Sequence, residues 1–402
     1  MAELTLTDGG GDQARRVEAG WLASAAARQV AAALAAGGAE ALFVGGCVRN
    51  ALIGAAVADL DMATDAPPAE VQALLEAAGI RHVPTGIEHG TVTALVDGRG
   101  VEITTFRKDV ETDGRRAVVA FGGTLEEDAA RRDFTLNALY ARPDGEVLDP
   151  LGHGLADLEA RRIRFIGDPA ARIEEDRLRI LRFYRFHALY GEAQRGLDAA
   201  GQAACAAAAA GVEALARERI GAEIRKLLAA PDPGPALAAM AEAGVLARTL
   251  PSASLDALGR LAAAEALSGA APDWKRRLVA MGVAPDDAAE RLRLSRADLR
   301  ALRSILAAKE EERPPGQNAY RHGAEAARDA ALLTAAAAGA PPPKALQREV
   351  AKGATQEFPV SAEDLVARGM KPGKALGARL AKLEEAWLDS NFRLTRGEML
   401  DG

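Results

Sequence analysis

Two aspartates that stand two residues apart, Asp59 and Asp61, are the first candidates for chemistry, in the segment ADLDMATD. The segment has a strand-like pattern, and in a strand residues i and i+2 point to the same face, so both carboxylates would project together. Two carboxylates held so close repel each other unless a cation lies between them, and Mg²⁺ prefers such a pair completed by phosphate and water oxygens. Glu102, in the strand-like segment VEITTFR, could bring a third carboxylate to the same face. Three carboxylates can hold two metals for in-line attack on a phosphate, but an isolated Asp-x-Asp is more often only a loop or a strand edge.

A glycine pair, Gly45 and Gly46, separates a short apolar strand from a helical stretch. Glycines let a phosphate approach the backbone, and the start of a helix offers free N–H groups and the positive end of its dipole. Arg49, in the first turn of that helix, could add a side-chain contact to a phosphate. A tight turn explains the pair equally well when it is taken alone. Cys47 has no His or Asp partner nearby in sequence and is expected to be a packed thiol.

Two adjacent arginines, Arg131 and Arg132, are followed directly by Asp133 at the end of a predicted short helix. The segment Thr124–Glu127 fits a capping box that would start this helix. An arginine pair beside a metal site suits triphosphate binding, and Asp133 and Asn137 could accept and donate hydrogen bonds at a ribose. The alternative is an ordinary surface arginine pair that interacts with a helix C-terminus.

The segment RIEEDRLRILRFYRFHALY predicts one continuous helix. Asp176 and Arg179 would be neighbours on one face of it at i and i+3, and Arg182 and Arg185 continue at the same spacing. A rigid Asp–Arg pair could present an acceptor and a donor fork to the Watson–Crick edge of a base. A plain salt bridge within the helix is the alternative.

The elements that must position these residues fall into two zones. Every clear strand signal lies between about residues 41 and 149, after a helix expected over 21–36; the expected strands are 41–44, 59–63, 91–96, 101–106 and a hairpin of 137–141 with 146–148. From residue 157 onward the periodicity is helical, with breaks at the proline clusters 231–235, 314–315 and 341–343. The pattern predicts an α/β head followed by a long all-helical remainder.

Length and composition agree with that division. A chain of 402 residues with 49% apolar and 27% charged residues is ordinary for a globular protein of two or three domains, and its alanine runs favour helix over an all-β fold. Two cysteines exclude a disulfide framework and a Cys-rich zinc site. The N-terminus lacks the order of a signal peptide, and no stretch approaches about 20 strongly apolar residues, so we expect a cytoplasmic protein without a membrane segment.

The net charge of −7 disfavours a nucleic-acid binder, but the charge is unevenly distributed. Residues 161–185 hold eight Arg against four acids, and residues 340–382 hold eight Lys or Arg against four acids. A polyanion could dock on these patches, although charge runs are usually solvated helix faces.

The order of these motifs is more informative than any one of them. GGCVRN, DLDMATD, TGIEHGTVTA, VEITTFR, RRDFTLNALY, DPLGHGLADL and EEDRLRILRFYRF follow one another as in one family. The chain resembles the bacterial class II tRNA nucleotidyltransferases, the CCA-adding enzymes, and their relatives the poly(A) polymerases, specifically over residues 41–190 and more loosely beyond.

The resemblance implies a polymerase-β-type nucleotidyltransferase fold, the α/β head, followed by an all-α neck, body and tail. We expect a disordered lead at 1–20, the catalytic head at 21–150, the neck with a nucleotide-reading helix at 151–230, the body at 231–340 and the tail at 341–402. The resemblance also implies that Asp59 and Asp61 are the metal-binding catalytic pair and that Glu102 is the third catalytic carboxylate. The implied cofactor is Mg²⁺, and the implied partners are tRNA, CTP and ATP. The nucleotide-binding residues it implies are Gly46, Arg49, Arg132, Asp133, Asp176, Arg179, Arg182 and Arg185, of which Asp176 and Arg179 would read CTP and then ATP.

One departure from the family concerns Asn50, which stands where the family usually has Asp. We expect the residue to pair with an arginine, a role that an amide can partly fill.

The implied function is completion of tRNA 3′ ends with C, C and A. Poly(A) polymerase is the first alternative, and addition of only CC or only A is the second; the stretch 108–122 resembles the flexible loop that full CCA enzymes retain. An inactive RNA-binding protein on the same fold is a third, disfavoured because Asp59, Asp61, Glu102, Asp176 and Arg179 are all present. The sequence leaves the oligomeric state open.

Overall fold

A computed structural model describes residues 15–87, 90–113 and 116–401 of the chain. Contacts within the chain divide it into two units, which we describe separately: Met1–Leu215 with Ala239–Val245, and Ala216–Ala238 with Leu246–Gly402. The division is coarser than the expected head, neck, body and tail, and the expected neck range 151–230 spans its boundary. The four-part division therefore stays a prediction.

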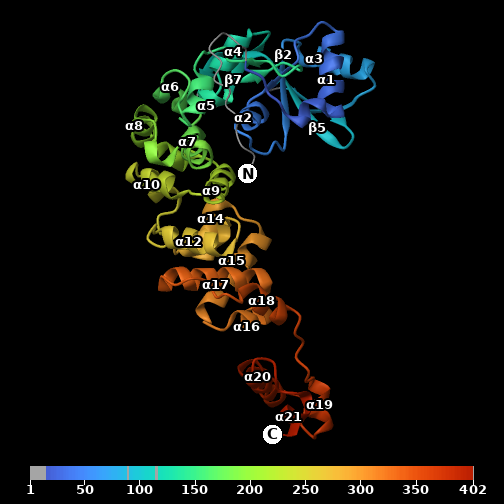
Figure 1. The fold of residues 1–402 in the computed structure, drawn as a ribbon, viewed down its shortest axis with the longest axis vertical. Helices are drawn as coiled ribbons and strands as arrows, with labels where there is room; N and C mark the ends of the chain where they lie inside the picture. The colour runs from blue at the N-terminus through green and yellow to red at the C-terminus, as the bar shows by residue number, and fades with distance from the viewer. Residues whose placement is uncertain (1–14, 88–89, 114–115, 402) are drawn as a thin grey trace. The chain divides into compact units, whose positions relative to one another are not determined.

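A mixed sheet forms the centre of the first unit (Figure 1). In the described residues its strands lie in the order β3-β4-β5-β2-β1-β8-β9, and β2 and β5 are parallel neighbours. Their bounds are β1 Leu42–Val44, β2 Leu60–Thr64, β3 Arg81–Gly86, β4 Thr91–Val96, β5 Arg99–Thr105, β8 Tyr140–Ala141 and β9 Val147–Leu148. These bounds confirm the expected strands and the expected hairpin to within a few residues.

Two helices, α1 (Ala25–Ala36) and α3 (Pro68–Ala77), contact β4 and β5. Met62 of β2 and Ile103 of β5 are register partners and fully buried. Since side chains alternate along a strand, Asp61 and Glu102 share the opposite face. The sheet thus buries one set of side chains and presents the carboxylates on the other side.

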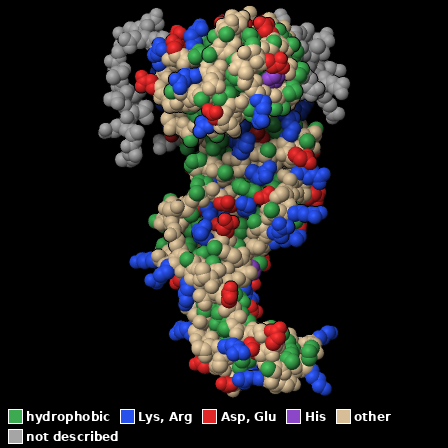
Figure 2. Space-filling model, turned by 90° about the vertical axis from the view of Figure 1, so that its right-hand side faces the viewer, with side chains coloured by type: hydrophobic (Ala, Val, Ile, Leu, Met, Phe, Trp, Pro, Cys, Tyr) green, Lys and Arg blue, Asp and Glu red, His purple; other side chains and the backbone are tan. Residues whose placement is uncertain are grey.

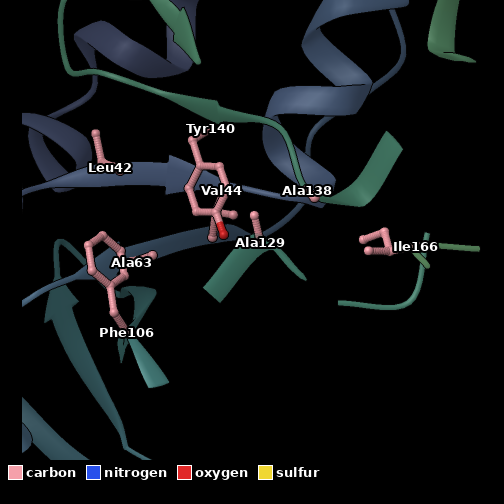
Figure 3. Close-up of a cluster of buried hydrophobic side chains, with 8 residues drawn as sticks. All are labelled: Leu42, Val44, Ala63, Phe106, Ala129, Ala138, Tyr140 and Ile166. Carbon is pink, nitrogen blue, oxygen red and sulfur yellow. The ribbon is translucent and has the colours of Figure 1, made fainter. Parts of the chain in front are cut away.

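A hydrophobic cluster lies where β1, β2 and β8 meet (Figure 3). It contains Leu42, Val44, Ala63, Phe106, Ala129, Ala138, Tyr140 and Ile166. Ala129 belongs to α4 (Leu125–Ala130), and Ala138 directly follows the short 3-10 helix η3 (Thr135–Asn137). Arg131, Arg132 and Asp133, which we call the arginine motif, lie between α4 and η3. The cluster therefore fixes the two elements that flank the arginine motif against the strand that carries Asp61.

The expected disordered lead at 1–20 is wrong in its last residues, and residues 1–14 lie outside the described part of the chain. Val17 is buried and its N–H donates to the carbonyl of Gly145, while Arg15 accepts at its carbonyl from Val147. The segment before η1 (Gly20–Ala23) therefore adds to the edge of the sheet at the β8–β9 hairpin.

Two features of the first unit were not predicted. Strand β3 contains Pro84 and is largely exposed, because it is an edge strand that pairs only with β4 and so needs neither apolar alternation nor every N–H. The stretch resembling a flexible loop forms an antiparallel hairpin of β6 (Arg107–Asp113) and β7 (Arg116–Phe121). Its charge-rich sequence carries no strand periodicity.

The helix expected over the EEDRLR segment is wrong as a single element. It is two helices, α6 (Pro169–Glu175) and α7 (Leu178–Tyr190), and Asp176 between them is extended, with φ −148° and ψ 105°. The Asp176 carboxylate accepts from the N–H of Leu178 at 3.0 Å, a local bond that competes with helix continuation.

Helix α7 is held by aromatic packing. Phe183 and Phe186 lie on rings of the preceding segment, with centroids 5.4 Å from Phe165 to Phe183 and 5.1 Å from Phe134 to Phe186. The remaining elements of this unit are α2 (Gly46–Leu52), α5 (Gly154–Glu159), η4 (Ala193–Arg195), α8 (Ala199–Ala207) and η5 (Ala209–Ala214).

Every regular element in the described residues of the second unit is a helix, as expected. Its helices, with α10 extending into the segment grouped with the first unit, are α9 Arg217–Leu228, α10 Gly234–Glu242, α11 Val245–Thr249, α12 Leu258–Ser268, α13 Trp274–Ala280, α14 Pro285–Leu292, α15 Arg296–Glu310, α16 Pro315–His322, α17 Ala324–Ala338, α18 Leu346–Ala354, α19 Ala362–Ala367, α20 Lys374–Asp389 and α21 Arg396–Asp401. None of the helices in the described ranges is long and apolar enough to cross a membrane.

A buried ion network organises the middle of this unit. Arg276 bonds Glu265 and Asp329 at 2.9 and 2.6 Å, and Arg277 bonds the same Glu265 at 2.8 Å. Arg277 also donates to the carbonyl of Leu228 at 2.7 Å, so it satisfies an acceptor at the end of α9. These charges have a structural role.

Candidate functional site

The acidic residues meet at one edge of the sheet. Asp61 of β2 and Glu102 of β5 are direct register partners in the parallel pair, and Asp59 precedes β2 by one residue. Burial and then repulsion from Glu102 raise the pKa of Asp61 to about 6, and Asp59 adds a smaller repulsion, whereas Arg132 opposes the shift. The structure thus brings Asp59 and Glu102 close enough to Asp61 for each of them to repel its carboxylate.

The donor set of this edge fits Mg²⁺. In the described residues no three His, Cys, Asp or Glu side chains converge into a ready-made metal cage. Mg²⁺ does not need one, because it is bound by one or two carboxylates and keeps water and substrate phosphates as its other ligands. Burial and, after it, repulsion from Glu102 raise the pKa of Asp61, and a cation bound at this edge would favour the charged carboxylate against both effects.

The glycine pair brings the start of α2 against the arginine motif. Gly45 has φ 68° and ψ −117°, a conformation that favours glycine, and its N–H donates to the carbonyl of Leu139 at 3.0 Å. A Cβ built at Gly45 would lie 3.6 Å from the Arg132 guanidinium, so the backbone here runs beside that charge. Gly46 is the first residue of α2, so the helix begins within the glycine pair, one residue earlier than expected.

Arg49 is buried and bonded on several sides. Its side chain donates to the Asn50 amide oxygen at 2.9 and 3.1 Å, to the Tyr190 hydroxyl at 2.8 Å and to the Asn137 amide oxygen. Burial lowers the pKa of Arg49. Asn50 therefore pairs with an arginine, as predicted, and Arg49 acts within a network rather than as an exposed phosphate contact.

Arg131 and Arg132 converge on Asp128, a residue the sequence reasoning did not select. The Asp128 carboxylate accepts from Arg131 at 2.5 Å, from Arg132 at 2.9 Å and from the Tyr140 hydroxyl at 2.6 Å. Burial raises the pKa of Asp128, but Arg132 and Arg131 outweigh it and hold the pKa below its usual value. The capping box expected at Thr124 is present and starts α4, the helix that carries Asp128.

Asp133 connects the arginine motif to α7. Its carboxylate accepts from Arg182 at 2.5 and 2.7 Å and from Asn137 at 2.9 Å. Burial raises the pKa of Asp133, but the Arg182 charge outweighs it and the pKa is lowered. Asp133 and Asn137 thus lie together, as expected, with their polar atoms held by neighbours.

The expectation that Asp176 and Arg179 share one helix face is wrong, because Asp176 lies in the break before α7, where its carbonyl accepts from the N–H of Arg179 at 3.0 Å. Arg179 pairs instead with Glu175 at 2.5 Å, and Glu175 also binds Arg172 at 2.7 Å. Arg172 in turn donates to the carbonyl of Arg132 at 2.6 Å. The break places Asp176 directly before α7, and the Glu175 bridge ties Arg179 to the arginine motif.

Arg185 completes the predicted set. It is buried, and its guanidinium lies 4.4 Å from the centre of the Phe186 ring. Together these contacts bring the start of α2, the arginine motif and α7 into one polar network in the first unit, beside the strand that carries Asp61.

Comparisons with known proteins find relatives over most of the chain. The model of the Poly A polymerase head domain matches residues 41–164, and that of the probable RNA and SrmB-binding site of polymerase A matches residues 197–255. The chain is 34% identical over 371 residues to the CCA-adding enzyme of Limosilactobacillus fermentum, covering 89% of this chain and 90% of that protein. It is 31% identical to the mitochondrial CCA tRNA nucleotidyltransferase 1 of Mus musculus, covering 90% and 86%.

The fold is also similar to solved structures. The Bacillus stearothermophilus CCA-adding enzyme in complex with CTP matches with a TM-score of 0.75 and 28% identity, covering 90% of this chain and 92% of that one. The Thermotoga maritima CCA-adding enzyme complexed with tRNA matches in fold alone, with a TM-score of 0.66 at 18% identity over 97% and 98% of the chains. The chain belongs to the family of class II CCA-adding enzymes and poly(A) polymerase heads, as a CCA tRNA nucleotidyltransferase.

Proposed function

We propose that this enzyme completes the 3′ ends of tRNA, adding C, C and A from CTP and ATP in the order of the finished end. The observation that carries the proposal is similarity over nearly the whole chain to CCA-adding enzymes, with the acidic pair and the arginine motif in one place. Relatives that match over this length bear the CCA-adding name, so we favour complete CCA addition over poly(A), CC-only or A-only addition.

We propose that Asp59 and Asp61 hold the catalytic cation and that Glu102 completes the acidic edge. The family is one of metal-dependent nucleotidyltransferases, and Mg²⁺ is our choice of ion because the ligands are carboxylate oxygens. When bound, Mg²⁺ would polarise the reacting phosphate and offset the charge that develops on it. Asp61 is anchored for this role by the pairing of β2 with β5.

The arginine motif is proposed to hold the nucleotide. Arg132 interacts electrostatically with Asp61, so its charge lies on the side where a triphosphate would meet the metal. The hydrogen bond to Asp128 fixes the direction of the Arg132 guanidinium. Gly46 has no side chain that would keep a phosphate away from the backbone at the start of α2. Asp133 lies buried beside Asn137, suitably placed for a ribose hydroxyl.

Base selection is proposed to rest on Asp176 and Arg179, with Arg182 and Arg185 supporting the nucleotide. The Asp176 carboxylate is fixed by the N–H of Leu178, and Arg179 by Glu175. A fixed acceptor and a fixed donor can distinguish cytosine and adenine, which carry an exocyclic amine, from uracil and guanine, which carry a carbonyl at that position.

Docking of tRNA must use local basic surface, because the net charge is −7. Figure 2 shows one face of the molecule on which Lys and Arg side chains stand at several places, many with acidic neighbours. Lys371 and Lys374 are exposed, and we propose them as RNA contacts.

We propose a cytoplasmic location for this enzyme. Its relatives include bacterial enzymes and also proteins named as mitochondrial.

The test is incorporation of labelled CTP and ATP into a tRNA transcript that lacks CCA. We expect incorporation that disappears with a chelator and returns on addition of Mg²⁺. Lack of incorporation into tRNA at any Mg²⁺ concentration would contradict the proposed function. Incorporation that the chelator leaves intact would contradict the proposed role of the acidic edge.

A further inference from the structure

One face of α7 carries Arg182, Phe186 and Tyr190, which stand four residues apart and therefore line one side of the helix. The Arg182 guanidinium lies 5.4 Å from the centre of the Phe186 ring, and the centroids of the Phe186 and Tyr190 rings are 5.5 Å apart. The three side chains form a continuous stripe, which we call the α7 stripe. The resemblance assigned a role to Arg182 and none to the two aromatic residues.

Arg49 of α2 lies on this stripe. Its guanidinium carbon is 4.0 Å from the centre of the Tyr190 ring and 5.2 Å from that of Phe186, and one guanidinium nitrogen donates to the Tyr190 hydroxyl at 2.8 Å. Arg49 is only 5% exposed. Tyr190 therefore contacts Arg49 both with its ring and with its hydroxyl. Because water is excluded around Arg49, the attraction between its charge and the Tyr190 ring is stronger than it would be at the surface.

The same arginine is joined to the other end of the stripe by polar contacts. Arg49 donates to Asn137, Asn137 donates to Asp133 at 2.9 Å, and Asp133 accepts from Arg182 at 2.5 Å. The contacts therefore close a circuit that starts at Tyr190 and returns to α7 two turns earlier. Every element in the circuit, α2, η3 and α7, belongs to the first unit.

We propose that Tyr190 is a positioning residue for nucleotide selection: it holds Arg49 and so fixes α7 relative to the glycine turn at the start of α2. The inference rests on the proposed function and deepens it. The residues proposed to read the base stand at the start of α7, whereas Gly46 stands at the start of α2, and the circuit sets the distance between these two places. The acidic edge is anchored separately by β2 and β5, so the chemical step should not depend on Tyr190.

The test compares Tyr190→Phe, which keeps the ring and removes the hydroxyl, with Tyr190→Leu, which removes both. We expect Tyr190→Phe to raise KM for CTP and ATP about fivefold, the effect of one hydrogen bond, with kcat nearly unchanged. Tyr190→Leu should raise KM by a further factor of about thirty and increase misincorporation of UTP. The matched control is Tyr184→Phe on the same helix, whose ring packs on Phe183, and we expect it to behave as wild type.

A double-mutant cycle with Arg49→Lys separates positioning from simple destabilisation. If Tyr190 acts through Arg49, the effects of Arg49→Lys and Tyr190→Phe on KM should be clearly less than additive. Additive effects on KM would overturn the inference. So would a fall in kcat and a rise in KM that are of the same size in Tyr184→Phe as in Tyr190→Phe. Should Tyr190→Leu fail to fold, Tyr190→Phe and the cycle still decide.

The inference and the proposed function can fail separately. Binding of CTP is measured by calorimetry without tRNA, alongside the extension assay. A wild-type enzyme that neither binds CTP nor extends tRNA would overturn the proposed function and this inference with it. A wild-type enzyme that does both, together with a Tyr190→Phe variant indistinguishable from it, would overturn only the role of Tyr190.

Discussion

Asp128 is the buried charge on which the arginine motif depends, and Asp128→Asn is the most direct perturbation of it. The Asp128 side chain is 1% exposed, whereas those of its partners Arg131 and Arg132 are 14% and 19% exposed. The amide keeps the shape and can still accept from Tyr140, but it removes the buried negative charge that the Arg131 and Arg132 guanidinium groups share.

The expected cost follows from this geometry. Removing one partner of a buried ion pair typically destabilises by about 3–5 kcal/mol, and the partial exposure of both arginines places this site at the lower end, about 3 kcal/mol. In a unit of this size that corresponds to a fall in Tm of about 6–12 °C. Loss of Arg132 positioning should also raise KM for CTP.

Thermal unfolding of the full chain measures the effect. The transition of the first unit is the one whose Tm rises when CTP is added, since a ligand stabilises the unit that binds it. The control is Asp144→Asn, which removes an exposed carboxylate whose ion pair with Arg16 is 3.1 Å long. Because water and salt screen an exposed ion pair, the control should change Tm little.

The pH dependence provides a second check on Asp128. Its pKa is lowered in the folded protein, so its stabilising effect is present above the unfolded pKa, near 3.9, and is lost as the pH falls through the folded pKa. The stability difference between wild type and Asp128→Asn should be complete at neutral pH and shrink below about pH 4. A fall in Tm in Asp128→Asn no larger than that in Asp144→Asn would refute the reasoning. So would a stability difference between wild type and Asp128→Asn that stays the same at every pH.

Three further predictions concern chemistry, docking and base choice. Asp61→Ala should abolish addition of both C and A with the fold retained in circular dichroism, because a metal ligand at phosphoryl transfer contributes several kcal/mol to the barrier; near-normal turnover would contradict the assignment. Lys371→Glu with Lys374→Glu should weaken tRNA binding and reduce its salt dependence by about one phosphate contact per residue, with CTP affinity unchanged; unaltered tRNA affinity would make these lysines a solvated face. Asp176→Asn keeps an acceptor for the start of α7. It should lower discrimination against UTP about tenfold or more in four-nucleotide incorporation assays, since a carboxylate held against the carbonyl of the wrong base in the bound complex costs about 1–3 kcal/mol. Equal loss of all nucleotides would instead indicate a structural residue.

Much of the sheet could be predicted from the sequence, because its strands carry short-range signals. The alternation around Asp61 and Glu102 predicted both strands, and their parallel register then placed the carboxylates together. The turn at 143–145 predicted the last hairpin for the same reason, a local preference of Pro, Asp and Gly. Strand β3 was not predicted because an exposed edge strand needs no alternation of apolar and polar residues.

The contacts of the arginines were less predictable, since they depend on tertiary structure. Asp128 could have been found, because it stands three and four residues before Arg131 and Arg132 on a predicted helix. Tyr190 could not, because it contacts Arg49 across 141 residues of sequence. The break at Asp176 was hidden by an apolar spacing that suits one helix, although an aspartate can end a helix through its own backbone contacts.

The measurement that tests the central claim most directly is sequencing of the 3′ ends made on one tRNA transcript lacking CCA. Separate reactions contain CTP alone, ATP alone, or both. A single site that selects C twice and then A predicts ends in CC, unchanged ends, and CCA, respectively. Runs of A with ATP alone would identify a poly(A) polymerase, and ends that stop at CC when both nucleotides are present would identify a CC-adding enzyme, and either result would contradict the account.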